Sequence, residues 1–269
     1  MEHRLHKIAV GFYGQPRYTN IKAIAQNLKL FFQNHEITVF GFFWIPSEKL
    51  PLQSTWNRTR NWLSPSFRED LKVSWPKSHL QFHQQKDFTL ESSNLHGLLS
   101  TRFFNSNEII SEENLFNLIS QLYSIEKVSL MIQQHEIDEE KQFDFIAITR
   151  PDTILRSRTR LHGLDLDSVN IDDAHGRFPD NLIIYPRNKF SSIQTYTHIH
   201  QLVDYVRFPV AESFKESLIF LDDLNAKIVM HPWQVTLFGR KAGVISNFAE
   251  SQRLRWNSRI PYRLFNANR

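Results

Sequence analysis

KIAVGFY (Lys7–Tyr13) and ITVFGFFW (Ile37–Trp44) decide the fold of this chain, because both are short, β-rich runs of apolar residues. Such continuous runs are typical of strands that are buried on both faces of a sheet. The segment between them keeps helical spacing, with Asn20 as its cap and apolar residues at Ile21, Ile24, Leu28 and Phe31. Strand, helix and strand in this order predict a parallel βαβ unit with a right-handed crossover.

A second alternation of the same kind follows farther along the chain. Ser111 can cap a long helix, and acidic residues occupy its first turn. The buried stripe of this helix is formed by Leu115, Leu118, Ile119, Leu122, Ile125 and Ile132. FDFIAIT (Phe143–Thr149) is the next buried strand, and a short strand is expected at Leu182–Tyr185. The two alternations predict an α/β protein with a mostly parallel central sheet flanked by helices.

The segment after the second strand has no sustained period. Residues 46–107 are rich in Trp, Ser, Gln and His and contain several prolines. We interpret them as an irregular insertion that holds one short helix near residues 65–71 and one strand near residues 80–82. Beyond the second alternation, helical patterns are found at residues 191–206, 211–224 and 232–243.

The composition is that of an ordinary globular chain. Of its 269 residues, 41% are hydrophobic and 22% are charged, and this balance excludes an intrinsically disordered protein. Because no internal repeat or clean linker divides the chain, we expect a single domain over residues 1–269. The absence of cysteine excludes disulfide frameworks, cysteine-ligated zinc, iron–sulfur clusters and thiol catalysis. His79 and His83 are four residues apart, but no third ligand is evident, so we expect no zinc site there.

The net charge is mildly positive, at +4 from 32 basic and 28 acidic residues. This charge suits an anionic small ligand or an acidic membrane surface, and it gives no reason to expect a nucleic-acid partner. The sequence shows neither a signal peptide nor an apolar run of membrane-spanning length. We therefore expect a soluble, cytoplasmic protein.

Polar residues follow the first predicted strand directly. Gly14 allows a tight turn, Gln15 offers an amide, and Arg17 offers a planar cation for phosphate. The alternative is that this segment is only a turn and that Arg17 is solvated. Neither the P-loop motif nor the Rossmann glycine motif is present, which disfavours P-loop kinases, GTPases and Rossmann dehydrogenases.

The strand at residues 143–149 also leads into charged residues. Arg150 and Asp152 follow it, and the proline between them restricts the chain direction. We expect the two side chains at an exposed sheet edge, where ligands bind in open parallel sheets. An arginine can pair with a diphosphate, and a carboxylate can hold a divalent cation that bridges it. The alternative is an Arg–Asp ion pair that closes a loop.

Four segments, in order along the chain, resemble one family. They are IAVGFYGQPR (residues 8–17), FDFIAITRPD (residues 143–152), GRFPDNLII (residues 176–184) and HPW (residues 231–233). Together they are similar to bacterial glycosyltransferase-like proteins of surface-polysaccharide gene clusters, over roughly residues 7–245. The resemblance implies a GT-A-like, nucleotide-sugar-binding fold. The chain departs from the usual family residues at Arg150, in place of the first acid of Asp-x-Asp, and at Pro179, Tyr185 and Trp233.

The resemblance also implies roles for the residues at the strand ends. Breaking a sugar–phosphate bond leaves a nucleoside diphosphate, whose charge must be neutralised by a cation, by arginines or by both. Asp152 would be the metal-side carboxylate for Mn²⁺ or Mg²⁺, with His231 as a second ligand. The residues that bind the donor phosphates would be Gly14, Gln15, Arg17 and Arg150.

A transfer with inversion needs a general base to deprotonate the acceptor hydroxyl. The family match places an acid just before a short strand, which makes Asp180 the first candidate. Asp173 is the second, because the neighbouring Asp172 could raise its pKa by like-charge repulsion. The alternative for Asp172 and Asp173 is a solvated loop.

The function expected from the resemblance is transfer of a sugar from a nucleotide-sugar donor to a glycan or lipid-linked acceptor in surface-polysaccharide synthesis. Residues 7–152 would form the nucleotide-binding part and residues 153–250 the acceptor-side part. Residues 251–269 form a basic tail with interleaved aromatic residues, which could contact the inner membrane face. The alternative function is a non-catalytic module that keeps the fold and binds glycan or a partner protein.

Overall fold

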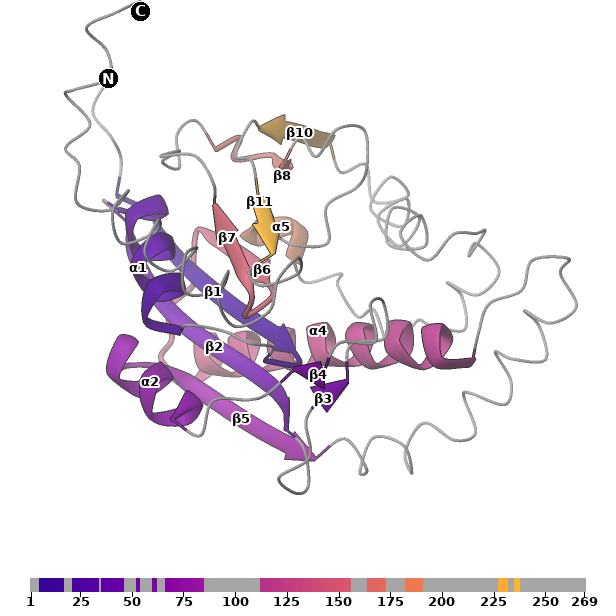
Figure 1. Ribbon diagram of the computed structural model, residues 1–269. Coiled ribbons are helices and arrows are strands. Elements are labelled where there is room, and N and C mark those ends of the chain that lie inside the picture. The colour runs from indigo at the N-terminus through magenta and orange to yellow at the C-terminus, as the bar shows by residue number, and fades with distance from the viewer. Residues whose placement is uncertain are drawn as a thin grey trace, which may run out of the picture.

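The computed structural model describes the following residues, to which all structural statements apply: 5–16, 21–33, 35–45, 52–53, 60–61, 66–84, 112–155, 164–172, 182–190, 227–231 and 235–237. They form a mixed α/β structure (Figure 1). The helices are α1 (Ile21–Phe31), α2 (Phe67–Ser74), α4 (Glu112–Asp138) and the single-turn α5 (Arg187–Phe190).

Seven of the described strands form one sheet, in the order β10-β8-β9-β6-β1-β2-β5. Their bounds are β1 Lys7–Gly14, β2 Glu36–Ile45, β5 His79–Gln84, β6 Phe145–Thr149, β8 Ser168–Asp172, β9 Leu182–Pro186 and β10 Lys227–His231. Strand β9 runs antiparallel to both of its neighbours, and every other pairing in this sheet is parallel. The predicted α/β class with a mostly parallel sheet is therefore confirmed.

Helices cover both faces of the sheet (Figure 1). On one face, Ile8, Val10 and Phe12 of β1 belong to a buried apolar cluster that includes Leu28 of α1 and Leu71 of α2. The long helix α4 lies on the other face. It is held there in part by a hydrogen bond of 2.7 Å, which the indole Nε1 of Trp44 donates to Ser124 Oγ.

The close approach of α4 explains one of the few glycines. A Cβ atom at Gly11 would lie 2.4 Å from Cγ1 of Val128 and 3.0 Å from Cδ1 of Ile148. No real Cβ makes contacts of 2.4 Å, so only a residue without a side chain lets α4 pack at this depth.

A buried ion pair closes the amino edge of the sheet. Arg187, directly after β9, donates from Nε to Glu136 Oε1 at 2.8 Å, and its Nη2 lies 2.7 Å from Oε2. The backbone N–H of Phe143 also donates to Oε1, at 3.0 Å. Because Glu136 belongs to α4, this carboxylate joins the end of α4, the segment before β6 and the end of β9.

Two further pairs of short strands lie outside the main sheet. Strand β3 (Leu52–Gln53) is antiparallel to β4 (Arg60–Asn61), and β7 (Thr153–Leu155) is antiparallel to β11 (Val235–Leu237). The second pair joins the chain after β6 to the chain after β10.

Within residues 46–107, the short helix expected near residues 65–71 and the strand expected near residues 80–82 are confirmed as α2 and β5. The sequence did not predict that β5 pairs in parallel with β2 and extends the main sheet. The prediction of a helix over residues 232–243 is wrong, because Val235–Leu237 is strand β11. The predicted helices at residues 191–206 and 211–224 lie outside the described residues.

Candidate functional site

The candidate site lies at the topological switch point of the sheet, where the strand order reverses. From β1 the chain passes through α1 to β2 on one side, whereas β6 pairs with β1 on the other side. Ligands of open α/β sheets bind beyond the carboxyl ends of the strands at such a switch point. The register pairs Phe12 with Thr149, so the residues after both strands emerge side by side.

The turn after β1 is built around Gly14. Its φ angle is +89°, a backbone conformation that residues with a Cβ rarely adopt. Among the residues that the structure describes, no atom lies within 4 Å of the position that a Cβ would take, so no described side chain fills the space above this turn. Gly14 and Gln15 therefore lie where the sequence predicted them, at the carboxyl edge, whereas Arg17 lies outside the described residues.

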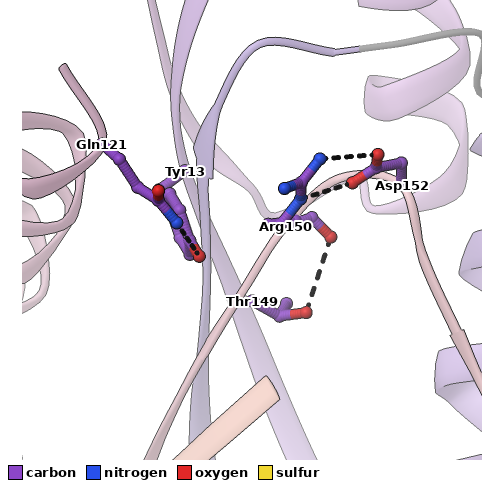
Figure 2. A network of polar contacts seen from close by, with 5 residues as sticks. All are labelled: Tyr13, Gln121, Thr149, Arg150 and Asp152. Atoms are coloured by element: carbon purple, nitrogen blue, oxygen red, sulfur yellow. Dashed lines mark hydrogen bonds and ion pairs between the residues drawn. The ribbon is translucent and has the colours of Figure 1, made fainter. Parts of the chain in front are cut away.

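Two polar residues that the sequence reasoning missed lie beside this turn. Tyr13 is buried at the end of β1, and Gln121 of α4 donates a hydrogen bond from Nε2 to its hydroxyl oxygen at 3.1 Å (Figure 2). A tyrosine that ends an otherwise apolar strand was the only signal in the sequence. The contact brings α4 to the carboxyl edge as well.

Arg150 and Asp152 form a bidentate ion pair directly after β6 (Figure 2). Arg150 donates from Nε to Asp152 Oδ1 and from Nη2 to Oδ2, each at 2.9 Å. The side chain of Asp152 is 1% exposed and that of Arg150 is 11% exposed. The paired geometry, with charge on both partners, makes these strong hydrogen bonds.

A backbone hydrogen bond and a buried proline also stabilise this turn. The N–H of Thr153 donates to the carbonyl oxygen of Arg150 at 3.2 Å, and Pro151 between the paired residues is buried. The expectation that Asp152 lies at an exposed edge is wrong, because the turn folds its carboxylate inward against the guanidinium. The ion pair between Arg150 and Asp152 that the alternative interpretation expected is present.

The described residues do not fit a divalent cation on Asp152. Mg²⁺ and Mn²⁺ take several oxygen ligands, but both oxygens of Asp152 already accept hydrogen bonds from Arg150, whose positive charge repels a cation. Among the side chains that the structure describes, no three His, Cys, Asp or Glu residues are placed to hold a metal ion.

The other predicted site positions lie partly at the same edge. His231 ends β10 and is the register partner of Asp172, which ends β8. Strand β9 separates β8 from β6, so the ends of β8 and β6 are about 10 Å apart at the usual strand spacing. The metal role of His231 stays a prediction. Asp173 and Asp180 lie outside the described residues.

The pairing between β7 and β11 links the chain after Arg150 and Asp152 to the chain after His231. Thr153, the residue after Asp152, is paired with Leu237, and Leu155 is paired with Val235. The segment that follows His231 is therefore drawn back to the segment that follows Arg150 and Asp152.

A separate group of histidines lies on the α4 side of β5, away from the switch point. The rings of His79 and His135 of α4 have centroids 4.5 Å apart, and His79 is also stacked on Phe40. Desolvation lowers the pKa of His79 below its usual 6.5, His135 lowers it further, and Glu139 opposes the shift.

No family model matches this chain, and no curated protein matches it. In the part of the chain that the structure describes, no helix has the length and apolar character needed to cross a membrane.

Proposed function

We propose that this protein transfers a sugar from a nucleotide-sugar donor to a glycan or lipid-linked acceptor. The observation that carries the proposal is the arrangement at the switch point, where an open glycine turn after β1 lies beside a fixed guanidinium after β6. A turn of this kind lets a phosphate approach the backbone, and a guanidinium binds phosphate oxygens in pairs. A diphosphate leaving group needs both kinds of contact.

The GT-A-like fold is part of this proposal. It is supported by a mostly parallel sheet with helices on both faces and by a candidate ligand site at the carboxyl edge.

The reversed strand β9 supports Asp180 as the general base. Because β9 is antiparallel, its first residue, Leu182, lies at the carboxyl edge, where it is paired with Thr149. Asp180 precedes Leu182 by two residues, a length of chain that spans at most about 7 Å. The base would then act close to the leaving group beside Arg150. Asp173, after β8, is the second candidate at the same edge.

Calorimetric titration with a panel of UDP- and GDP-sugars tests the proposal. Saturable binding of at least one donor, followed by sugar transfer to a glycan or lipid-linked acceptor, is the expected result. A protein that binds no nucleotide sugar would contradict it.

One observation favours the second candidate function, a non-catalytic binding module. The carboxylate that would face a metal in most transferases of this fold is buried in an ion pair. Donor binding without turnover, together with retained glycan binding, would support the module and contradict the enzyme.

A further inference from the structure

We infer that Arg150, oriented by Asp152, takes the place of a divalent cation, so that this protein binds a nucleoside diphosphate without metal. The inference rests on the proposed function and concerns how the same site neutralises the diphosphate. It follows from the ion pair itself, and it assigns Asp152 a positioning role in place of the expected metal ligation.

The geometry makes Asp152 a poor metal ligand. A cation could reach its oxygens only by displacing two charge-assisted hydrogen bonds of 2.9 Å. The displacement would leave the guanidinium of Arg150, which is 11% exposed, without its counter-charge. Breaking a buried ion pair in this way is strongly unfavourable.

The usual metal site and the Arg150–Asp152 pair have the same net charge. Two carboxylates with one divalent cation sum to zero, and so does one arginine with one aspartate. In both arrangements a carboxylate holds the positive group in place. Replacing the first acid of the usual pair by Arg150 therefore supplies the cation and removes one of its ligands in a single substitution.

The guanidinium is oriented for such a contact. Asp152 accepts from Nε and Nη2, and Figure 2 shows the remaining nitrogen, Nη1, turned away from Asp152. A guanidinium held along one edge keeps its planar fork in one orientation, which lowers the entropy lost when phosphate binds. Asp152 acts through Arg150 and touches no substrate.

The unmodified protein provides the first test, with UDP and GDP as probes. Calorimetric titrations are run once with EDTA and once with Mn²⁺, and Mn²⁺ is also titrated alone. We expect the Kd of the better probe to agree in the two buffers within about threefold, less than 1 kcal/mol. Mn²⁺ alone should give no saturable binding. A probe that binds only with Mn²⁺ overturns the inference and leaves the proposed function in place.

Variants provide the second test. Arg150→Lys should weaken probe binding by about tenfold or more in both buffers, because a point charge cannot replace the paired contact. Asp152→Asn should weaken binding in EDTA as well as in Mn²⁺, because Arg150 loses its orientation. If Asp152 were a metal ligand, Asp152→Asn would leave probe affinity in EDTA unchanged and would remove only the increase in affinity that Mn²⁺ gives. That result overturns the inference.

Arg187→Lys is the matched control. Arg187 forms the same kind of two-point ion pair with Glu136, but at the amino edge of the sheet. It should lower thermal stability without changing probe binding, and an equal loss of binding in this variant would contradict a specific role for Arg150. If the Arg150 and Asp152 variants fail to fold, the comparison of EDTA with Mn²⁺ on the unmodified protein still decides. A protein that binds neither probe in either buffer overturns both the inference and the proposed function.

Discussion

Gly11 and Gly14 lie three residues apart on β1 and are glycines for different reasons. Gly11 is required by packing, since Val128 of α4 occupies the space of a side chain, whereas Gly14 is required by its φ angle of +89°. One position therefore serves the contact between α4 and the sheet, and the other serves the turn at the candidate site.

Alanine substitution separates these two reasons. Gly14→Ala should cost about 1–2 kcal/mol of unfolding free energy through backbone strain alone, because no atom of the described residues lies within 4 Å of the new methyl group. Gly11→Ala should cost about 1–3 kcal/mol by overpacking. Urea denaturation measures both, and UDP titration distinguishes them further, because only Gly14→Ala should weaken probe binding. Equal binding by the two variants would contradict a ligand role for the turn.

Asp180 gives a prediction about turnover. Asp180→Ala should lower the rate of sugar transfer by about 10²–10⁴-fold, the usual contribution of a positioned general base, with little change in donor affinity. Steady-state kinetics and donor titration on the same preparation provide the two numbers. A collapse of donor affinity would instead assign Asp180 to the nucleotide site, and Asp173 would become the candidate base.

The elements show which patterns in the sequence are informative. Strands β1, β2 and β6 and helix α4 were predicted, because each is a continuous apolar run or carries a regular apolar stripe. Strand β5 (HLQFHQ) was found only in part, because this edge strand half-buries only alternate residues and four of its six positions are polar. Strand β11 was taken for helix, because its pairing with β7 depends on residues about eighty positions away.

The candidate site could likewise be predicted from the sequence only in part. The carboxyl edge and the residues Gly14, Gln15, Arg150 and Asp152 could be predicted, because strand ends are visible in the sequence. The sequence could not predict whether the carboxylate of Asp152 faces a ligand or pairs with Arg150. Both outcomes use the same residues and differ only in how one turn folds. The positions of His231 and Asp172 on paired strands also required the sheet order.

The contact between β5 and α4 gives a prediction about pH. The pKa of His79 is lowered in the folded protein, first by desolvation and then by His135, with Glu139 opposing. As pH falls below 6.5, the unfolded chain takes up this proton before the folded protein does. Stability should therefore be complete above pH 6.5 and should decrease as pH falls toward the folded pKa.

Urea denaturation between pH 5 and pH 8 measures this dependence. His79→Gln should flatten the acid limb, and His135→Gln should reduce it by removing the like charge beside His79. An acid limb of unchanged slope in His79→Gln would contradict the assignment.

At the scale of the whole molecule, the mild net charge of +4 leaves the tail as the strongest basic segment. Residues 251–269 lie outside the described structure and contain five arginines among aromatic and aliphatic residues, without an acid. Anionic head groups attract each nearby arginine by about 1 kcal/mol, and aromatic rings can enter the interface.

We therefore predict reversible, salt-sensitive binding to vesicles that contain anionic lipid. Co-sedimentation of the full chain and of a variant that ends at residue 250 measures it, with neutral vesicles as the control. A folded, shortened protein that binds anionic vesicles as well as the full chain does would rule out a membrane role for the tail.

The central place of β1 has a consequence for synthesis on the ribosome. One side of β1 pairs with β2, which follows at once, but its other side pairs with β6, and the hydrogen bond from Lys7 to Asp144 spans 137 positions of sequence. At about 5–20 residues per second, the apolar strand Ile8–Phe12 has one open edge for roughly 7–30 seconds. During that interval the nascent chain offers an unpaired strand edge to any neighbouring chain, so a strand that is interior in the finished sheet is an exposed edge while the chain is being made.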